Sequence, residues 1–225
     1  MGGDRVASGC WEREDSPSDK SGQSLRLKML MDKINRLHRP LVVGIGGSTR
    51  AGSTSERALR VALDLVGKTG CDTVAFAGPD IMLPPFEMGA VQNSETAARL
   101  IDALRRASGV IISSPGYHGL MSGIIKNVLD YTEEMRSDKL PYLEGRVVGS
   151  IVCANGAQAI GTTLVSLRSV IHALRAWPTP YAMAIQTDAK RPPSDETAEW
   201  LPGLTILAEQ VASFVHSNVA GKLAA

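Results

Sequence analysis

The feature that most constrains the fold is a regular alternation of short apolar runs with longer segments of helical spacing, which begins at Leu41. Each run is rich in β-branched or other apolar residues, as expected of strands that are buried on both faces. The segments between the runs place apolar residues three or four positions apart, as in helices that bury one face. This alternation predicts a parallel sheet with helices on both sides. The predicted strands are residues 41–46, 72–77, 109–114, 146–154 and 181–185.

Five strand–helix units without a large insertion favour one arrangement of the sheet. We predict a flavodoxin-like three-layer α/β sandwich whose five-stranded parallel sheet has the order 2-1-3-4-5, rather than the six-stranded dinucleotide-binding fold. In such sheets, ligands bind outside the carboxyl ends of the strands. The loops after the first, third and fourth strands are therefore the candidate binding loops.

Composition divides the 225-residue chain into three parts. Residues 1–23 are polar and predict a mobile N-terminal tail. Residues 24–39 carry apolar side chains at helical spacing and end before a proline, which predicts an additional amphipathic helix. Residues 40–220 are predicted to form the flavodoxin-like domain, and the 44% hydrophobic content of the chain is enough for one sizeable core.

Charge and cysteine spacing narrow the classes of partner. The net charge is +1 with no basic stripe, which argues against nucleic acid and favours small-molecule partners. Cys10, Cys71 and Cys153 lack the spacing of a disulfide framework or a zinc site, so we expect no metal and a reducing compartment. No apolar run is long enough for a membrane span or a signal peptide, and we therefore expect a cytoplasmic protein.

The loop after the first predicted strand, residues 46–56, combines glycines, hydroxyl side chains and an arginine in front of a helix. Helix N-termini offer free N–H groups and positive potential, which suits a phosphate. The loop lacks the third glycine of a dinucleotide fingerprint and the lysine of a phosphate-binding loop of the Walker type. A terminal monoester phosphate, such as that of FMN, fits it better. The alternative is local, since Ser53 and Glu56 have the spacing of a capping box that begins a helix without any ligand.

The loop after the third predicted strand, residues 113–123, is rich in glycine and proline. Its backbone can run flat along an aromatic ring system, with Tyr117 and His118 stacking or hydrogen-bonding nearby. The alternatives are that Tyr117 covers the rim of the core and that His118 is structural.

The segments GGSTRAGSTS and SPGYHGLMSGIIKNVLDY together resemble the phosphate loop and the flavin loop of the NAD(P)H-dependent FMN reductase family, and the resemblance runs from about Leu41 to Ile185. The family includes flavin reductases that serve two-component monooxygenases, and quinone, azo-dye and chromate reductases. The positions that match are Gly47, Ser48, Arg50 and Ser53 in the first segment and Pro115, Tyr117, Gly123, Lys126, Asn127 and Asp130 in the second.

The resemblance implies a set of FMN-binding residues within residues 40–220. The phosphate ligands would be Ser48, Arg50, Ser53, Thr54 and Ser55; the residues along the ring would be Pro115, Gly116, Tyr117, His118 and Gly119; and those at the edge of the flavin would be Asn155 and Gly156. Gly116 and His118 stand where many members have glutamate and asparagine, so the contacts at the rim of the ring are expected to differ.

The resemblance also implies an activity. NADPH or NADH would pass a hydride to FMN, which would reduce free flavin, a quinone, an azo dye or a metal oxyanion. No side-chain acid or base is required, and no catalytic residue is assigned. A flavin-dependent monooxygenase that receives reduced flavin would be a possible partner, and a homodimer or homotetramer is expected. Two alternatives stay open: a non-enzymatic FMN electron carrier, which the near-neutral charge argues against, and a flavodoxin-like regulatory module.

Overall fold

The computed structural model describes residues 24–26, 29, 39–187 and 196–224. Contacts within the chain divide it into two units, Met1–His38 and Arg39–Ala225, and the second unit contains the sheet. The expected tail at 1–23 lies outside the described residues. The expected helix at 24–39 is described only at residues 24–26 and 29, which are helical, and at Arg39. The predicted domain bounds therefore stay predictions.

A parallel sheet forms the middle layer of the second unit. Its strands lie in the order β2-β1-β3-β5, and β6 and β7 both pair with β5 on the outer side. The five predicted strands thus occupy the order 2-1-3-4-5, and the flavodoxin-like fold is confirmed. The strands are β1 (Leu41–Gly46), β2 (Asp72–Phe76), β3 (Ala107–Tyr117), β5 (Val147–Ala154), β6 (Trp177–Pro178) and β7 (Met183–Gln186).

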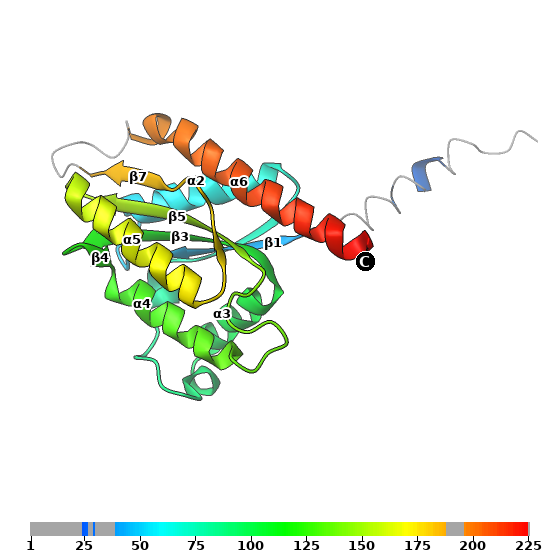
Figure 1. The fold of residues 1–225 in the computed structure, drawn as a ribbon, viewed down its shortest axis with the longest axis horizontal. Coiled ribbons are helices and arrows are strands. Elements are labelled where there is room, and N and C mark those ends of the chain that lie inside the picture. Colours follow the sequence, from blue (N-terminus) through cyan, green and yellow to red (C-terminus); the bar gives the residue numbers. More distant parts are fainter. Residues whose placement is uncertain (1–23, 27–28, 30–38, 188–195, 225) are drawn as a thin grey trace, which may run out of the picture. The chain divides into compact units, whose positions relative to one another are not determined.

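Helices cover both faces of the sheet. The helices α3, α4 and α5 pack with one side of the strands, whereas α2 and α6 pack with the other (Figure 1). Neighbouring residues of β3 point to opposite faces of the sheet. Ile112 packs in the core beneath α3, α4 and α5, and Ile111 packs in the core beneath α2 and α6. The helices are α2 (Thr54–Lys68), α3 (Glu95–Arg106), α4 (Gly123–Asp130), α5 (Ala157–Ala173) and α6 (Glu196–Ala224), with short 3₁₀ segments η1 (Gly78–Ile81), η2 (Ala90–Asn93) and η3 (Tyr131–Met135).

The sheet of the described residues has seven strands, two more than the sequence predicts. The fifth predicted strand is present as β7, and the short β6 pairs with Val147 and Val148 ahead of it. The other addition is β4 (Leu120–Met121), which runs antiparallel to the end of β3. Strands of two residues are too short to show a hydrophobic period, which explains why the sequence pattern missed them.

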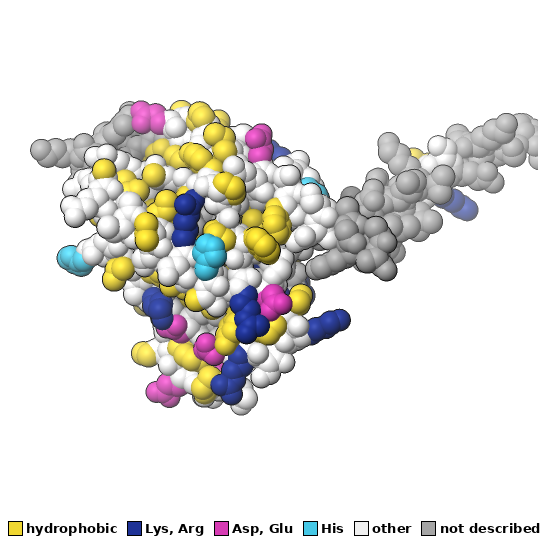
Figure 2. Space-filling view, viewed as in Figure 1, with side chains coloured by type: hydrophobic (Ala, Val, Ile, Leu, Met, Phe, Trp, Pro, Cys, Tyr) yellow, Lys and Arg dark blue, Asp and Glu magenta, His cyan; other side chains and the backbone are white. Residues whose placement is uncertain are grey.

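The described helices include none with both the length and the apolar character needed to cross a lipid bilayer. Charged side chains of both signs lie over the lower part of the face shown in Figure 2, interspersed with hydrophobic ones.

Candidate functional site

A cavity of about 600 Å³ opens at the carboxyl ends of β1, β3 and β5, where ligands bind in sheets of this kind. Nine of the twelve predicted binding residues line it: Ser48, Arg50, Ser53, Thr54, Ser55, Pro115, Gly116, Tyr117 and Asn155. The cavity therefore brings together the three loops that the sequence singled out. Its volume falls in the range of about 300 to 1,000 Å³ that is usual for small-molecule sites.

One end of the cavity is formed by the start of α2. The buried side chain of Ser53 caps the helix, because its Oγ accepts a hydrogen bond from the amide of Glu56 at 3.3 Å. The Glu56 carboxylate accepts from the amide of Gly52 at 3.0 Å, one residue before the position expected of a capping box. Capping leaves the amides of Thr54 and Ser55 without an acceptor among the described residues.

The lining of this end suits an anion. Arg50 is the one charged side chain among the described residues that line the cavity, and none of these residues is acidic. Hydroxyl side chains line the same end of the cavity, and those of Ser53 and Ser55 lie 3.3 Å apart. A cation, several hydroxyls and free helix amides are the donors that a phosphate dianion requires. The residues present therefore fit the phosphate of FMN.

Buried hydrogen bonds hold this end of the cavity against the second loop. The Ser113 Oγ donates to the carbonyl of Ser55 at 2.8 Å, and the Ser122 Oγ donates to the carbonyl of Gly47 at 2.9 Å. Residue 47 must be glycine, because an ideal Cβ there would lie 2.7 Å from the Cγ1 of Ile125. The two loops are thus fixed relative to each other before any ligand binds.

The other end of the cavity is a backbone wall. Pro115 pairs in register with Cys153 of β5, and the wall continues through Gly116 to Tyr117, whose side chain is 58% exposed. The Ser114 Oγ donates to the carbonyl of Pro115 at 2.9 Å, which helps to fix the first residue of the wall. Neither Pro115 nor Gly116 carries a large side chain. This part of the wall can therefore accept a flat ring, as the isoalloxazine of FMN requires.

The family is identified by a match over most of the chain. A family model described as NADPH-dependent FMN reductase matches residues 40–190, which is more than half of the chain. The chain belongs to the NADPH-dependent FMN reductase family. The resemblance noted from the sequence is thereby confirmed, as is the prediction of an oxidoreductase that uses FMN and NAD(P)H.

Individual relatives agree with this identification. An NAD(P)H-dependent FMN reductase of Pseudomonas aeruginosa is 28% identical over 130 residues, which cover 56% of this chain and 70% of that protein. The flavoenzyme FerB, an NAD(P)H:(acceptor) oxidoreductase of Paracoccus denitrificans, superposes with a TM-score of 0.60 at 18% identity, covering 80% of this chain and 98% of that one. A WrbA-like flavodoxin of Agrobacterium tumefaciens gives a TM-score of 0.56 at 15% identity, with coverages of 80% and 98%. The two solved structures share the fold.

Three predicted residues of this FMN reductase lie outside the main cavity. His118 and Gly119 form the turn between β3 and β4, with φ angles of 52° and 83° that are typical of a two-residue hairpin turn. They line a second cavity of about 410 Å³ together with Leu120 and residues of α5. Gly156 precedes α5 at its N-cap position. The structure therefore separates His118 and Gly119 from the residues that line the main cavity.

The match at Lys126, Asn127 and Asp130 has a structural explanation. The Asn127 Oδ1 accepts from the amide of Phe86 at 2.8 Å, and its Nδ2 donates to the carbonyl of Pro84 at 2.9 Å. Lys126 and Asp130 form an exposed ion pair at 2.6 Å along α4. Asn127 therefore holds the loop after η1 against α4, and none of the three residues lines the cavity.

Four residues that line the cavity were missed by sequence reasoning: Thr49, Cys153, Ala154 and Thr187. Thr187 follows β7, and its amide donates to the carbonyl of Ala154 at 2.8 Å. The rule that ligands bind at carboxyl ends of strands applies to the fifth strand as well, and it would have found Thr187. Cys153 and Ala154 end the fourth predicted strand, and the same rule points to them.

Proposed function

We propose that this FMN reductase binds FMN in the main cavity, with the phosphate at the start of α2 and the ring along the wall from Pro115 to Tyr117. The proposal rests on one observation: a single cavity joins an anion-binding helix terminus to a backbone wall. FMN held there would supply hydride and electron transfer between NAD(P)H and a small-molecule acceptor.

The residues of the chain contribute binding and orientation. Arg50 and the hydroxyls of Ser48, Ser53 and Ser55 would hold the phosphate, and the positive end of the α2 dipole would add to them. Bound FMN would supply the redox chemistry, which is a property of the cofactor. The part of the cavity lining that the structure describes holds neither a carboxylate nor an imidazole, which agrees with a reaction that depends on orientation of the reactants.

The two reactants would reach the flavin from the open side of the cavity, next to Tyr117. The exposed side chains of Tyr117 and Leu120, 58% each, offer an apolar approach for flat molecules such as a quinone or a second flavin. We propose free flavin, quinones, azo dyes and metal oxyanions as the acceptors to be compared. A flavin-dependent monooxygenase as recipient of reduced flavin, and a homodimer or homotetramer, are further parts of the proposal. We also propose a cytoplasmic location, which the free, buried thiol of Cys71 supports.

The first experiment measures oxidation of NADPH and of NADH by the purified full chain, with and without added FMN and with and without a quinone. Oxidation that needs added FMN and ignores the quinone would identify a flavin-supplying reductase. Turnover that a quinone stimulates on bound flavin would identify a quinone-type reductase. Bound FMN without any oxidation of NADPH or NADH would contradict the assignment as an enzyme and favour an electron carrier.

The second experiment tests where FMN binds. Arg50→Gln removes the charge that Arg50 brings to the cavity lining, so we expect FMN to bind about 10 to 100 times more weakly, since hydrogen bonds to charged groups contribute about 1.5–3 kcal/mol. Riboflavin lacks the phosphate and should lose no affinity. Fluorescence titration with both flavins measures the difference, and Arg136→Gln, an exposed residue outside the cavity, is the matched control. Equal weakening of both flavins would contradict the assigned phosphate site.

A further inference from the structure

The end of β3 and β4 form a hairpin that includes the wall from Pro115 to Tyr117. Two glycines of this hairpin lie against α5. An ideal Cβ on Gly116 would be 2.8 Å from the Oγ1 of Thr163 and 3.1 Å from the Cβ of Ala154. An ideal Cβ on Gly119 would be 2.8 Å from the Oγ1 of Thr162. Neither distance of 2.8 Å leaves room for a side chain. The hairpin therefore lies as close to α5 as the backbone permits.

The two threonines beneath the hairpin differ in their hydrogen bonds. Thr162 is exposed, and its hydroxyl donates to the carbonyl of Gln158 at 3.0 Å. Thr163 is completely buried, and its Oγ1 has no hydrogen-bond partner among the described residues. Buried hydroxyls are nearly always paired, so an unpaired one calls for another reason to be there. The close approach of this side chain to Gly116 supplies a reason based on shape.

We propose that Gly116 and Thr163 form a positioning pair for the flavin pocket. The side chain of Thr163 supports the bare Cα of Gly116 from the side of α5, and this contact sets where the wall from Pro115 to Tyr117 stands. Thr163 itself does not line the cavity and acts through Gly116. The inference rests on the proposed function, because it assigns the width of the proposed FMN site to this contact.

The test is a double-mutant cycle with FMN affinity as its readout. Gly116→Ala pushes the wall away from α5, and we expect FMN to bind about tenfold more weakly, which is about 1.4 kcal/mol. Gly116→Ala combined with Thr163→Ala removes the atom 2.8 Å away and should recover most of the lost affinity. Thr163→Val keeps the shape without the hydroxyl and should bind FMN like the wild type. Gly161→Ala, on α5 with nothing within 4 Å of its ideal Cβ, is the control and should leave FMN affinity unchanged.

Thermal unfolding without FMN, measured on each variant, separates a change in the site from a loss of folding. Wild-type affinity in Gly116→Ala, or no recovery in the double variant, would overturn the inference while the proposed function stands. Weak binding by Thr163→Val would overturn it too, because the hydroxyl rather than the shape would then matter. Failure of the wild-type chain to bind FMN would instead reject the proposed site itself. The Thr163→Val comparison decides the matter if Gly116→Ala does not fold.

Discussion

At the scale of single residues, side chains of one type perform different tasks in this protein. Ser48 and Arg50 border the cavity and are partly or fully exposed, so they are free to meet a ligand. Ser113 and Ser122 are buried and donate hydrogen bonds that join the two binding loops. The sequence marks all of them as polar residues of the two binding segments, and only their contacts in the fold divide ligands from supports.

Cys71 gives a prediction about stability at alkaline pH. The residue is 1% exposed, and its Sγ lies 3.7 Å from the Oγ1 of Thr69 and 3.7 Å from the Nε2 of His216. Burial raises the pKa of the Cys71 thiol above its ordinary value of 9.0, although the hydrogen bond with Thr69 and the charge of Arg39 oppose the shift and Asp72 adds to it.

The folded chain therefore keeps the Cys71 proton at pH values where the unfolded chain has lost it. The resulting stability is present in full below about pH 9 and is lost as the pH rises through the higher folded pKa. We expect the free energy of unfolding in urea to fall as the pH rises above about 9, and to fall less steeply in Cys71→Ala. The same slope in both proteins would rule out this thiol as the cause.

At the scale of elements, Asn127 connects α4 to the loop that follows η1. Its Oδ1 accepts from the amide of Phe86, while its Nδ2 donates to the carbonyls of Leu83 and Pro84 at 3.2 and 2.9 Å. The hydroxyl of Tyr131 donates to the same carbonyl of Pro84 at 3.1 Å. One amide side chain thus satisfies three backbone groups of a loop more than forty residues away in the sequence.

Asn127→Asp tests this connection with a change of almost no volume. The carboxylate still accepts from Phe86, but its second oxygen now faces two carbonyl oxygens. We expect a loss of about 2–3 kcal/mol in the free energy of unfolding, because the donor is gone and a charge is added beside acceptors. Asn93→Asp, exposed in η2, is the matched control and should stay within about 0.5 kcal/mol. Equal stability of the two variants in urea would show that the hydrogen bonds of Asn127 do not stabilise the fold.

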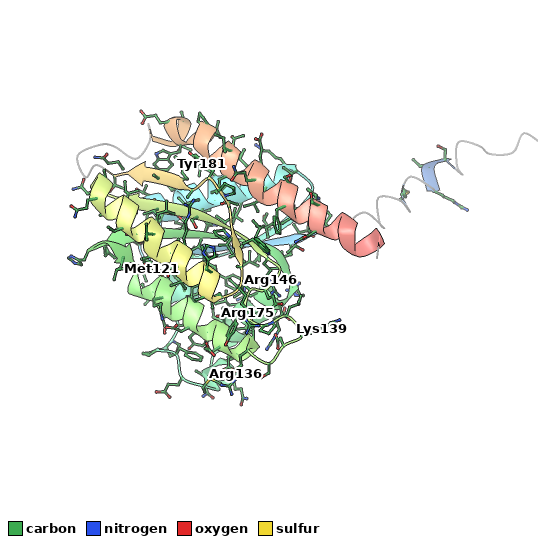
Figure 3. All side chains as sticks on the ribbon, in the orientation of Figure 1. Met121, Arg136, Lys139, Arg146, Arg175 and Tyr181 are labelled. Carbon is green, nitrogen blue, oxygen red and sulfur yellow. The ribbon has the colours of Figure 1, made fainter. Side chains whose placement is uncertain are left out.

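At the scale of the whole described domain, Arg146 organises the end of the sheet away from the cavity. It is 5% exposed and precedes β5, whereas Met121 belongs to the hairpin at the other end (Figure 3). Burial lowers the pKa of its guanidinium, whose four hydrogen bonds satisfy the charge. The carbonyls that accept are those of Arg105, Ala107, Tyr142 and Glu144, at 3.0 to 3.3 Å.

Arg146→Met should therefore separate stability from binding. We expect it to lower the free energy of unfolding by about 3 kcal/mol or more, since several buried carbonyls lose their donor. FMN affinity of the folded fraction should change less than about threefold, because the change lies far from the cavity along the strands. Arg175→Gln removes an exposed ion pair with Glu144 at 3.1 Å and the contact of the guanidinium with the Tyr142 ring, and it should cost less than about 2 kcal/mol. A large loss of FMN affinity in Arg146→Met would show that the two ends are coupled.

The sequence by itself determined the features that local chemistry controls. Buried strands and amphipathic helices leave periodic patterns, and Ser53 marks the start of α2 because its hydroxyl can cap only nearby amides. The strand order followed from the alternation of these elements, and the three loops that line the cavity followed from the strand order.

The tertiary structure alone decided which residues meet across those elements. It turned His118 and Gly119 away into a second cavity, brought Thr187 to the main one, and placed Thr163 under Gly116. It also split the outer edge of the sheet into β6 and β7 and added β4. These outcomes depend on contacts between segments far apart in the chain, whose distances and packing no local pattern of residues records.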